Sequence, residues 1–141
     1  MSFREKSAWI TLFSVLVCFG AYFAEVFARF GADRHFGALG SIHLLLLSTM
    51  ALVALQVGLN LAAAWTTPKD GRGPADEREI AIQRRSHTLG YHVLMVLALG
   101  LFAPALFGHR GVEMANFALL AVVIAALTVA VAQIVMFRRG A

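Results

Sequence analysis

The stretch MANFALLAVVIAALTVAVAQIVMF, residues 114 to 137, contains no Asp, Glu, Lys or Arg over 24 residues. About 20 apolar residues in a helix, at 1.5 Å per residue, cross the roughly 30 Å of hydrocarbon in a bilayer. Three uncharged stretches precede it, at 7–24, 39–65 and 86–108, with 18, 27 and 23 residues. Because each is near or beyond the length needed to cross a membrane, the sequence predicts four transmembrane segments.

The overall composition agrees with a membrane protein, since 60% of the residues are hydrophobic and 14% are charged. A soluble domain carries about a quarter charged residues. Runs such as LLLL at 44–47 and AVVI at 121–124 lack the alternation of a barrel strand. We therefore predict a single all-α domain over 1–141, a four-transmembrane-helix up-down-up-down bundle. Its helices are expected at about 3–30, 39–65, 76–107 and 113–138, with a linker at 66–75.

The basic residues predict the orientation. With four spans, both termini and the linker lie on one side, which carries nine basic residues: Arg4, Lys6, Lys69, Arg72, Arg78, Arg84, Arg85, Arg138 and Arg139. The other side carries three, namely Arg29, Arg34 and Arg110. Because cytoplasmic loops are enriched in Lys and Arg, we expect both termini on the cytoplasmic side of the membrane. The basic residues then reflect topology and contact with anionic lipids, and no direct binding of nucleic acid is expected.

The first span is expected to be a retained helix and not a cleaved signal peptide. Its apolar run is longer than the usual 7–15 residues, and Tyr22 and Phe23 crowd the small residues of a candidate cleavage site. Two capping boxes are predicted at helix starts, Ser2 with Glu5 and Asp76 with Glu79. Pro104 is expected to end or kink the third helix near its outer end.

The most informative charged segment is DEREIAIQRRSHTLGY, residues 76 to 91. Acidic residues at a helix start suit the positive end of the helix dipole, and Arg84 and Arg85 then suit the lipid headgroups. One interpretation is a capped helix start anchored at the membrane surface. The other is a docking surface for a cytoplasmic partner, formed together with Arg4, Glu5 and Lys6. Both interpretations remain open.

The opening MSFREKSAW at 1–9, the four short spans and Asp-Glu-Arg-Glu-x-x-Ile at 76–82 resemble a family of small four-helix bacterial inner-membrane proteins. The function of that family is uncharacterised, and its members are often encoded beside a small helix-turn-helix regulator. The resemblance implies a membrane protein that holds or inhibits a transcriptional regulator. The positions that carry over are Asp76, Glu77, Arg78, Glu79, Arg84 and Arg85.

Polar residues inside a membrane are costly and usually face other helices. Thr49, Gln56 and Asn60 share one face of the second span. The polar residues that could contact this face are His92 of the third span and Asn116, Thr128 and Gln133 of the fourth. Interhelical hydrogen bonding explains this region, and a transport or ion path in a small oligomer is the alternative.

The histidines form two groups. His35, His43 and His109 are expected near the outer end, with Asp33, Glu113 and Glu25, which are residue types that bind divalent metals. They lack a short ligand spacing, so interfacial hydrogen bonding is the simpler reading. His87 and His92 lie near the inner end and cannot join the outer three, which argues against one bis-His haem. No metal site or cofactor is therefore predicted, and a metal- or haem-binding membrane protein remains the third and least favoured alternative.

No motif for enzymatic chemistry is present, because the chain has no phosphate-binding loop, no redox Cys pair and no nucleophile-base spacing. We therefore expect no enzyme. Gly20, Gly58, Gly90 and Gly100 are expected to allow close helix approach. Small residues in the second span would serve a homodimer equally well. The function that these features favour is a non-catalytic regulatory membrane protein that docks and sequesters a cytoplasmic partner.

Overall fold

The computed structural model of the chain describes residues 3–31, 38–66, 76–108 and 111–139. All its regular elements in these ranges are helices: α1 (Phe3–Gly31), α2 (Ala38–Thr66), α3 (Glu77–Gly100), the short α4 (Phe102–Leu106) and α5 (Val112–Arg139). Helices α3 and α4 together form one apolar segment. With α1, α2 and α5, this gives four segments that are long and apolar enough to cross a membrane. The chain is thus an all-α four-helix bundle with the character of a multi-pass membrane protein, as predicted.

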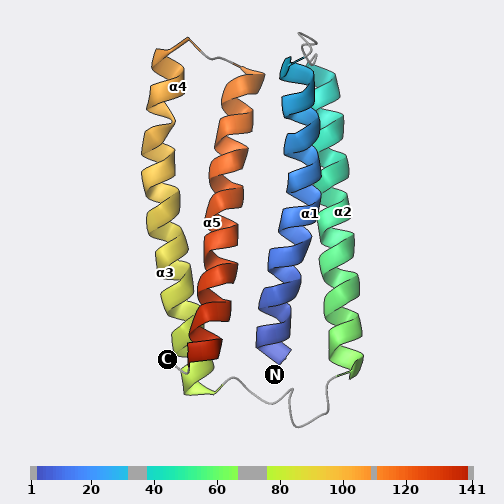
Figure 1. Cartoon of the computed structure of the whole chain (residues 1–141), viewed down its shortest axis with the longest axis vertical. Coiled ribbons are helices and arrows are strands. Elements are labelled where there is room, and N and C mark those ends of the chain that lie inside the picture. The colour runs from blue at the N-terminus through green and yellow to red at the C-terminus, as the bar shows by residue number, and fades with distance from the viewer. Residues whose placement is uncertain (1–2, 32–37, 67–75, 109–110, 140–141) are drawn as a thin grey trace.

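Successive long helices run in opposite directions, and both termini lie at the same end of the molecule (Figure 1). The pairs that pack extensively are α1 with α2, α1 with α5, and α3 with α5. Across the molecule the order is therefore α2, α1, α5, α3. Within the apolar segments, 33% of α1 and 28% of α5 is buried, against 6% of α3 and none of α2. The helices α1 and α5 form the centre, and α2 and α3 lie on its two sides.

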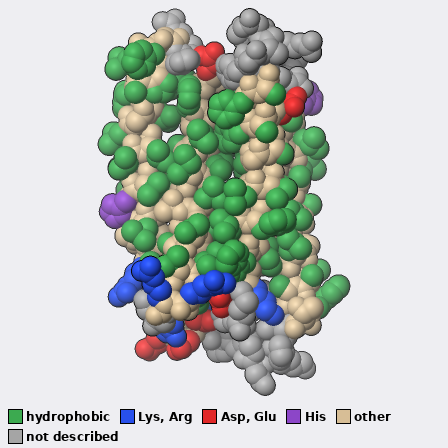
Figure 2. Space-filling model, in the orientation of Figure 1, with side chains coloured by type: hydrophobic (Ala, Val, Ile, Leu, Met, Phe, Trp, Pro, Cys, Tyr) green, Lys and Arg blue, Asp and Glu red, His purple; other side chains and the backbone are tan. Residues whose placement is uncertain are grey.

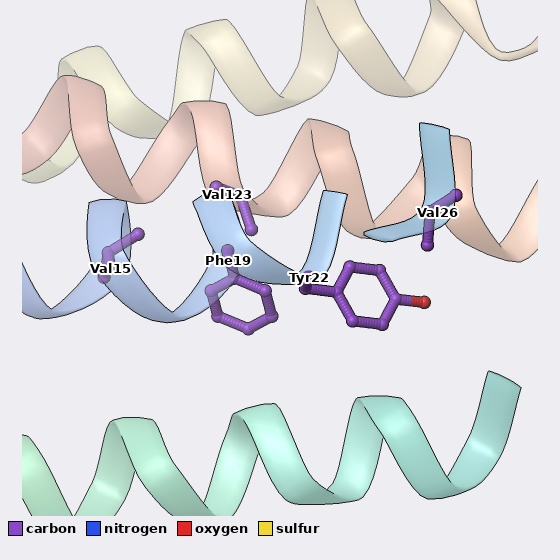
Figure 3. Packing of buried hydrophobic residues seen from close by; sticks show 5 residues of the cluster. All are labelled: Val15, Phe19, Tyr22, Val26 and Val123. Carbon is purple, nitrogen blue, oxygen red and sulfur yellow. The ribbon is translucent and has the colours of Figure 1, made fainter. Parts of the chain in front are cut away.

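The core is built on one stripe of α1. Val15, Phe19, Tyr22 and Val26 are buried together with Val123 of α5 (Figure 3). Their spacing of four, three and four residues is the seven-residue pattern that keeps one face of a helix against its neighbours. Leucines of α2 and α5 pack against this cluster, so α1 has buried contacts on two sides.

The third span is interrupted near its far end. Helix α3 ends at Gly100 and α4 begins at Phe102, with Leu101 between them. Pro104 lacks an N–H, and its ring crowds the carbonyl four residues earlier, which belongs to Gly100. This is the interruption predicted from Pro104.

The turn from α4 to α5 relies on two glycines. Gly108 has a φ of 88° and Gly111 a φ of 59°, both in the left-handed region. Side chains other than glycine adopt this region with strain, so these positions favour glycine. The chain can thus reverse direction within a few residues before α5 begins.

Candidate functional site

Charged side chains gather at the end of the molecule that holds both termini, while the visible length of the helices is mainly hydrophobic (Figure 2). The described residues of this charged end come from the first turns of α1, the first turns of α3 and the last turn of α5. We call it the charged end; its ionisable residues are Arg4, Glu5, Lys6, Asp76, Glu77, Arg78, Glu79, Arg84, Arg85, Arg138 and Arg139. All nine residues predicted to bind a partner therefore lie in one region.

Helix α3 begins at this end without the predicted capping box. Asp76 is the N-cap residue, with an extended backbone (φ −63°, ψ 149°), and its carbonyl accepts the N–H of Ile80 at 3.0 Å. No side-chain cap hydrogen bond is formed. Glu79 instead lies 3.0 Å from Nε of Arg4, so its carboxylate is directed to α1. The capping-box prediction is wrong here because an ion pair between helices competes for the same carboxylate. The other predicted box involves Ser2, which lies outside the described residues.

A second contact joins α5 to α1 at the same end. The guanidinium carbon of Arg138 lies 5.3 Å from the centre of the Trp9 ring, within the range of a cation–π interaction. Together with the pair between Arg4 and Glu79, it links the ends of α1, α3 and α5. Each contact is partly exposed and modest in energy, but the two together give the charged end a defined arrangement.

The pair between Arg4 and Glu79 gives the first testable prediction. Arg4→Glu places two carboxylates side by side and is expected to lower the free energy of unfolding by about 1 kcal/mol or less, because both side chains are partly exposed. The exchange of charges in Arg4→Glu with Glu79→Arg should restore most of that loss. Unfolding in bicelles at low and high salt checks both variants, and a loss well above 1 kcal/mol would contradict a solvent-screened pair.

The outward face of α3 carries the most accessible part of the charged end. Glu77, Ile80, Ala81, Arg84 and Arg85 line an open recess of about 480 Å³. All five side chains are exposed, as are Asp76 and Arg78, whereas Glu5 and Lys6 are half-buried and make contacts of their own. The recess has one acidic residue, Glu77, at the first turn of α3 and two arginines about two turns further along the helix, with Ile80 and Ala81 between them.

Below the recess, α3 is held tightly against α5. Ile82, Ser86 and Gly90 are buried at four-residue intervals on the side that faces α5. A Cβ added to Gly90 would overlap Cγ2 of Val129 and lie 3.4 Å from the Ala125 carbonyl oxygen. Gly90 thus allows the close approach that was predicted for it. At the other three glycines of that prediction, Gly20, Gly58 and Gly100, nothing lies within 4 Å of an added Cβ, so they have no such role in this bundle.

The intramembrane polar residues are not brought together within one chain. Gln56 and Asn60 lie on α2, where the Asn60 amide donates to the Gln56 carbonyl at 2.8 Å. His92 lies on α3 at the opposite side of the molecule, and its Nδ1 is 2.7 Å from the Thr88 carbonyl oxygen (Figure 1). Thr49 and Thr128 likewise bond to carbonyls of their own helices. Asn60, His92, Thr49 and Thr128 thus each bond to a carbonyl of their own helix, and no path within one chain contains Gln56, Asn60 and His92 together.

One polar contact between helices was not identified from the sequence. The Tyr22 hydroxyl donates to Oδ1 of Asn116 at 2.6 Å and joins α1 to α5 inside the buried cluster. The sequence marked Asn116 as polar and intramembrane, but it paired that residue with α2. The signal in the sequence was the spacing of Tyr22 from Val15, Phe19 and Val26, which places Tyr22 on an apolar face of its helix. A tyrosine hydroxyl buried on such a face needs a hydrogen-bond partner.

The outer end provides no metal centre among the described residues. No group of three or more His, Cys, Asp or Glu side chains is suitably placed there. His43 is exposed on α2 and makes contacts within the chain, while His35 and His109 lie outside the described residues. Near this end, a recess of about 250 Å³ between α1 and α5 has mainly phenylalanine and aliphatic walls.

No family model, curated protein or solved structure matches this chain. The geometry of the charged end and of the bundle is therefore the basis for assigning a function.

Proposed function

We propose that this chain is a non-catalytic regulatory protein of the bacterial inner membrane, with both termini in the cytoplasm. Within the charged end, the first turns of α1 and α3 dock and sequester a cytoplasmic partner, a small helix-turn-helix transcriptional regulator. The excess of Lys and Arg on the side of the termini supports this orientation through the positive-inside rule. The resemblance to membrane proteins encoded beside such regulators supports the kind of partner.

The observation that carries this proposal is the exposed recess on α3. Arginines at a membrane surface are expected for anchoring alone, but anchoring does not require Glu77, Arg84 and Arg85 to surround an apolar patch of Ile80 and Ala81. Such a patch with charges of both signs around it resembles the apolar centre and polar rim of a protein interface. Because the ion pair from Arg4 to Glu79 ties the first turn of α3 to α1, the helix that carries the recess is partly pre-organised for binding.

The bundle also offers a route for regulation. The turns that line the recess continue directly into the part of α3 packed on α5 at Ser86 and Gly90. A change in the packing of α3 on α5 would therefore move or rotate the recess. A stimulus regulates the partner in this way only if the two packing states differ in affinity for it.

Charge reversal in the recess tests the docking. We expect Glu77→Lys with Arg84→Glu and Arg85→Glu to reduce recovery of a co-expressed helix-turn-helix regulator at least tenfold, because unpaired and like charges at an interface oppose binding. The measurement is the amount of regulator from the neighbouring reading frame that copurifies with the detergent-solubilised protein. Arg139→Glu, an exposed reversal at the same end but on α5, is the matched control and should retain binding. Equal recovery from the triple variant and the native chain, or no recovery from either, would overturn the proposal.

A further inference from the structure

The face of α3 that points away from α5 carries two polar aromatic residues inside the apolar span. Tyr91 is 60% exposed and His92 is exposed as well. They lie six and seven residues beyond Arg85, which corresponds to about 10 Å further along the helix axis. If Arg85 is at the headgroups, both side chains are level with lipid hydrocarbon, where a polar group without a partner is costly.

The hydrogen bonds of His92 define what its free nitrogen can do. Nδ1 lies 2.7 Å from the Thr88 carbonyl oxygen, which can only accept, so Nδ1 carries the proton of this bond. In the neutral imidazole, Nε2 is then an acceptor. Tyr91 contributes only a ring contact with His92, at 5.8 Å between centroids. Among the described residues, the Tyr91 hydroxyl and Nε2 of His92 have no hydrogen-bond partner, leaving one donor and one acceptor at nearly the same depth.

We propose that a second copy of this chain covers this face and that the two copies form a parallel dimer through α3. In this dimer, the Tyr91 hydroxyl of each copy donates a hydrogen bond to Nε2 of His92 in the other copy.

Helix geometry supports this pairing. Consecutive residues are about 100° apart around a helix, so Tyr91 and His92 flank a line through Thr88 and Met95, opposite the side buried on α5. In a dimer with a two-fold axis along the membrane normal, the same face of each helix meets the other. The flank with Tyr91 in one copy then lies beside the flank with His92 in its partner, and this occurs twice.

The alternative occupant of this face is lipid. Lipid tails would cover Met95 and Leu99 equally well, but they supply no donor to the imidazole and no acceptor to the phenol. A second copy supplies both the donor and the acceptor at the same depth in the membrane. The dimer uses α3, not the small residues of α2. The recess with Glu77, Arg84 and Arg85 lies on this same face of α3, so a second copy and the cytoplasmic partner proposed above compete for that face.

The test measures association in lipid vesicles as the protein is diluted, with copies counted by photobleaching. We expect the native chain to dimerise and Tyr91→Phe or His92→Leu to weaken the dimer about tenfold, since two symmetric hydrogen bonds are lost. The double variant should be no weaker than either single variant, because both remove the same interaction. Thr49→Val, an exposed polar-to-apolar change on α2, is the matched control and should have no effect.

Cross-linking locates the interface independently. In a Cys18→Ala background, Met95→Cys on the outward face of α3 should form disulfide-linked dimers much faster than Val57→Cys, which is 62% exposed on α2. A chain that stays monomeric at every dilution, a Tyr91→Phe variant with native association, or equal cross-linking at both positions would overturn the proposal. A Soret band that is lost in His92→Leu would also overturn it, since Nε2 would then be a haem ligand.

Discussion

Replacing Gly90 by leucine is expected to separate α3 from α5 and to lower the free energy of unfolding by about 3 kcal/mol or more. The bundle has no space at this position, because even a single Cβ would overlap the Val129 side chain. Val129 is β-branched and stiff in a helix, so it cannot readily rotate away. Overpacking of a tight contact costs about 1–3 kcal/mol for a few added methylenes, and leucine adds a full branched chain. Unfolding by steric trapping in bicelles measures the loss.

The cause can be tested with a compensating change. Gly90→Ala is expected to cost about 1–2 kcal/mol, since its steric overlap outweighs the better helix propensity of alanine. Val129→Ala removes the overlapping methyl groups and should recover most of that cost in the double variant. Gly58→Ala on α2 is the matched control, because nothing lies within 4 Å of its added Cβ, and it should be neutral or slightly stabilising. If Gly58→Ala and Gly90→Ala had equal effects, close packing would not be the role of Gly90.

Replacing Tyr22 by alanine should produce the other large effect, a loss of about 3 kcal/mol. Tyr22 is only 3% exposed and makes edge-to-face contacts with Phe19 and Phe23 at 6.4 and 5.2 Å between ring centroids. Its removal leaves a cavity where α1 meets α5, and truncation of a buried aromatic ring typically costs about 3–5 kcal/mol. The same unfolding measurement in bicelles applies.

Two further variants separate the ring of Tyr22 from its hydroxyl. Tyr22→Phe keeps the packing but leaves Asn116 Oδ1 without its donor, so we expect a loss of about 1 kcal/mol. Phe13→Ala is the matched control on the same helix, since Phe13 is 58% exposed and faces away from the core. It should cost about 0.5 kcal/mol or less, and a cost comparable to that of Tyr22→Ala would contradict the assignment of the core to this stripe.

The candidate site was partly predictable from the sequence. The segment at 76–91 and the start of the chain were predicted to lie at the same end of the bundle, because an even number of spans returns the chain to the side on which it began. The charged residues of both segments lie at one end of the structure (Figure 2). The role of Glu79 was not predictable, because a capping box depends on neighbours in sequence, whereas its ion pair with Arg4 depends on which helices become adjacent. The separation of Gln56 and Asn60 from His92 was not predictable for the same reason, because it also depends on which helices become adjacent.

The sequence alone determined the number of membrane-spanning segments, their helical type and their approximate length. A chain in lipid must satisfy its backbone hydrogen bonds internally, and the thickness of the hydrocarbon sets the length of each span, so both properties follow from local composition. Only the tertiary structure decided which helices are neighbours. In lipid an apolar side chain is equally soluble on either face of a helix, so hydropathy does not indicate the buried side. The decisive contacts are steric and polar, such as Gly90 against Val129 and Tyr22 with Asn116, and they exist only once the helices are packed.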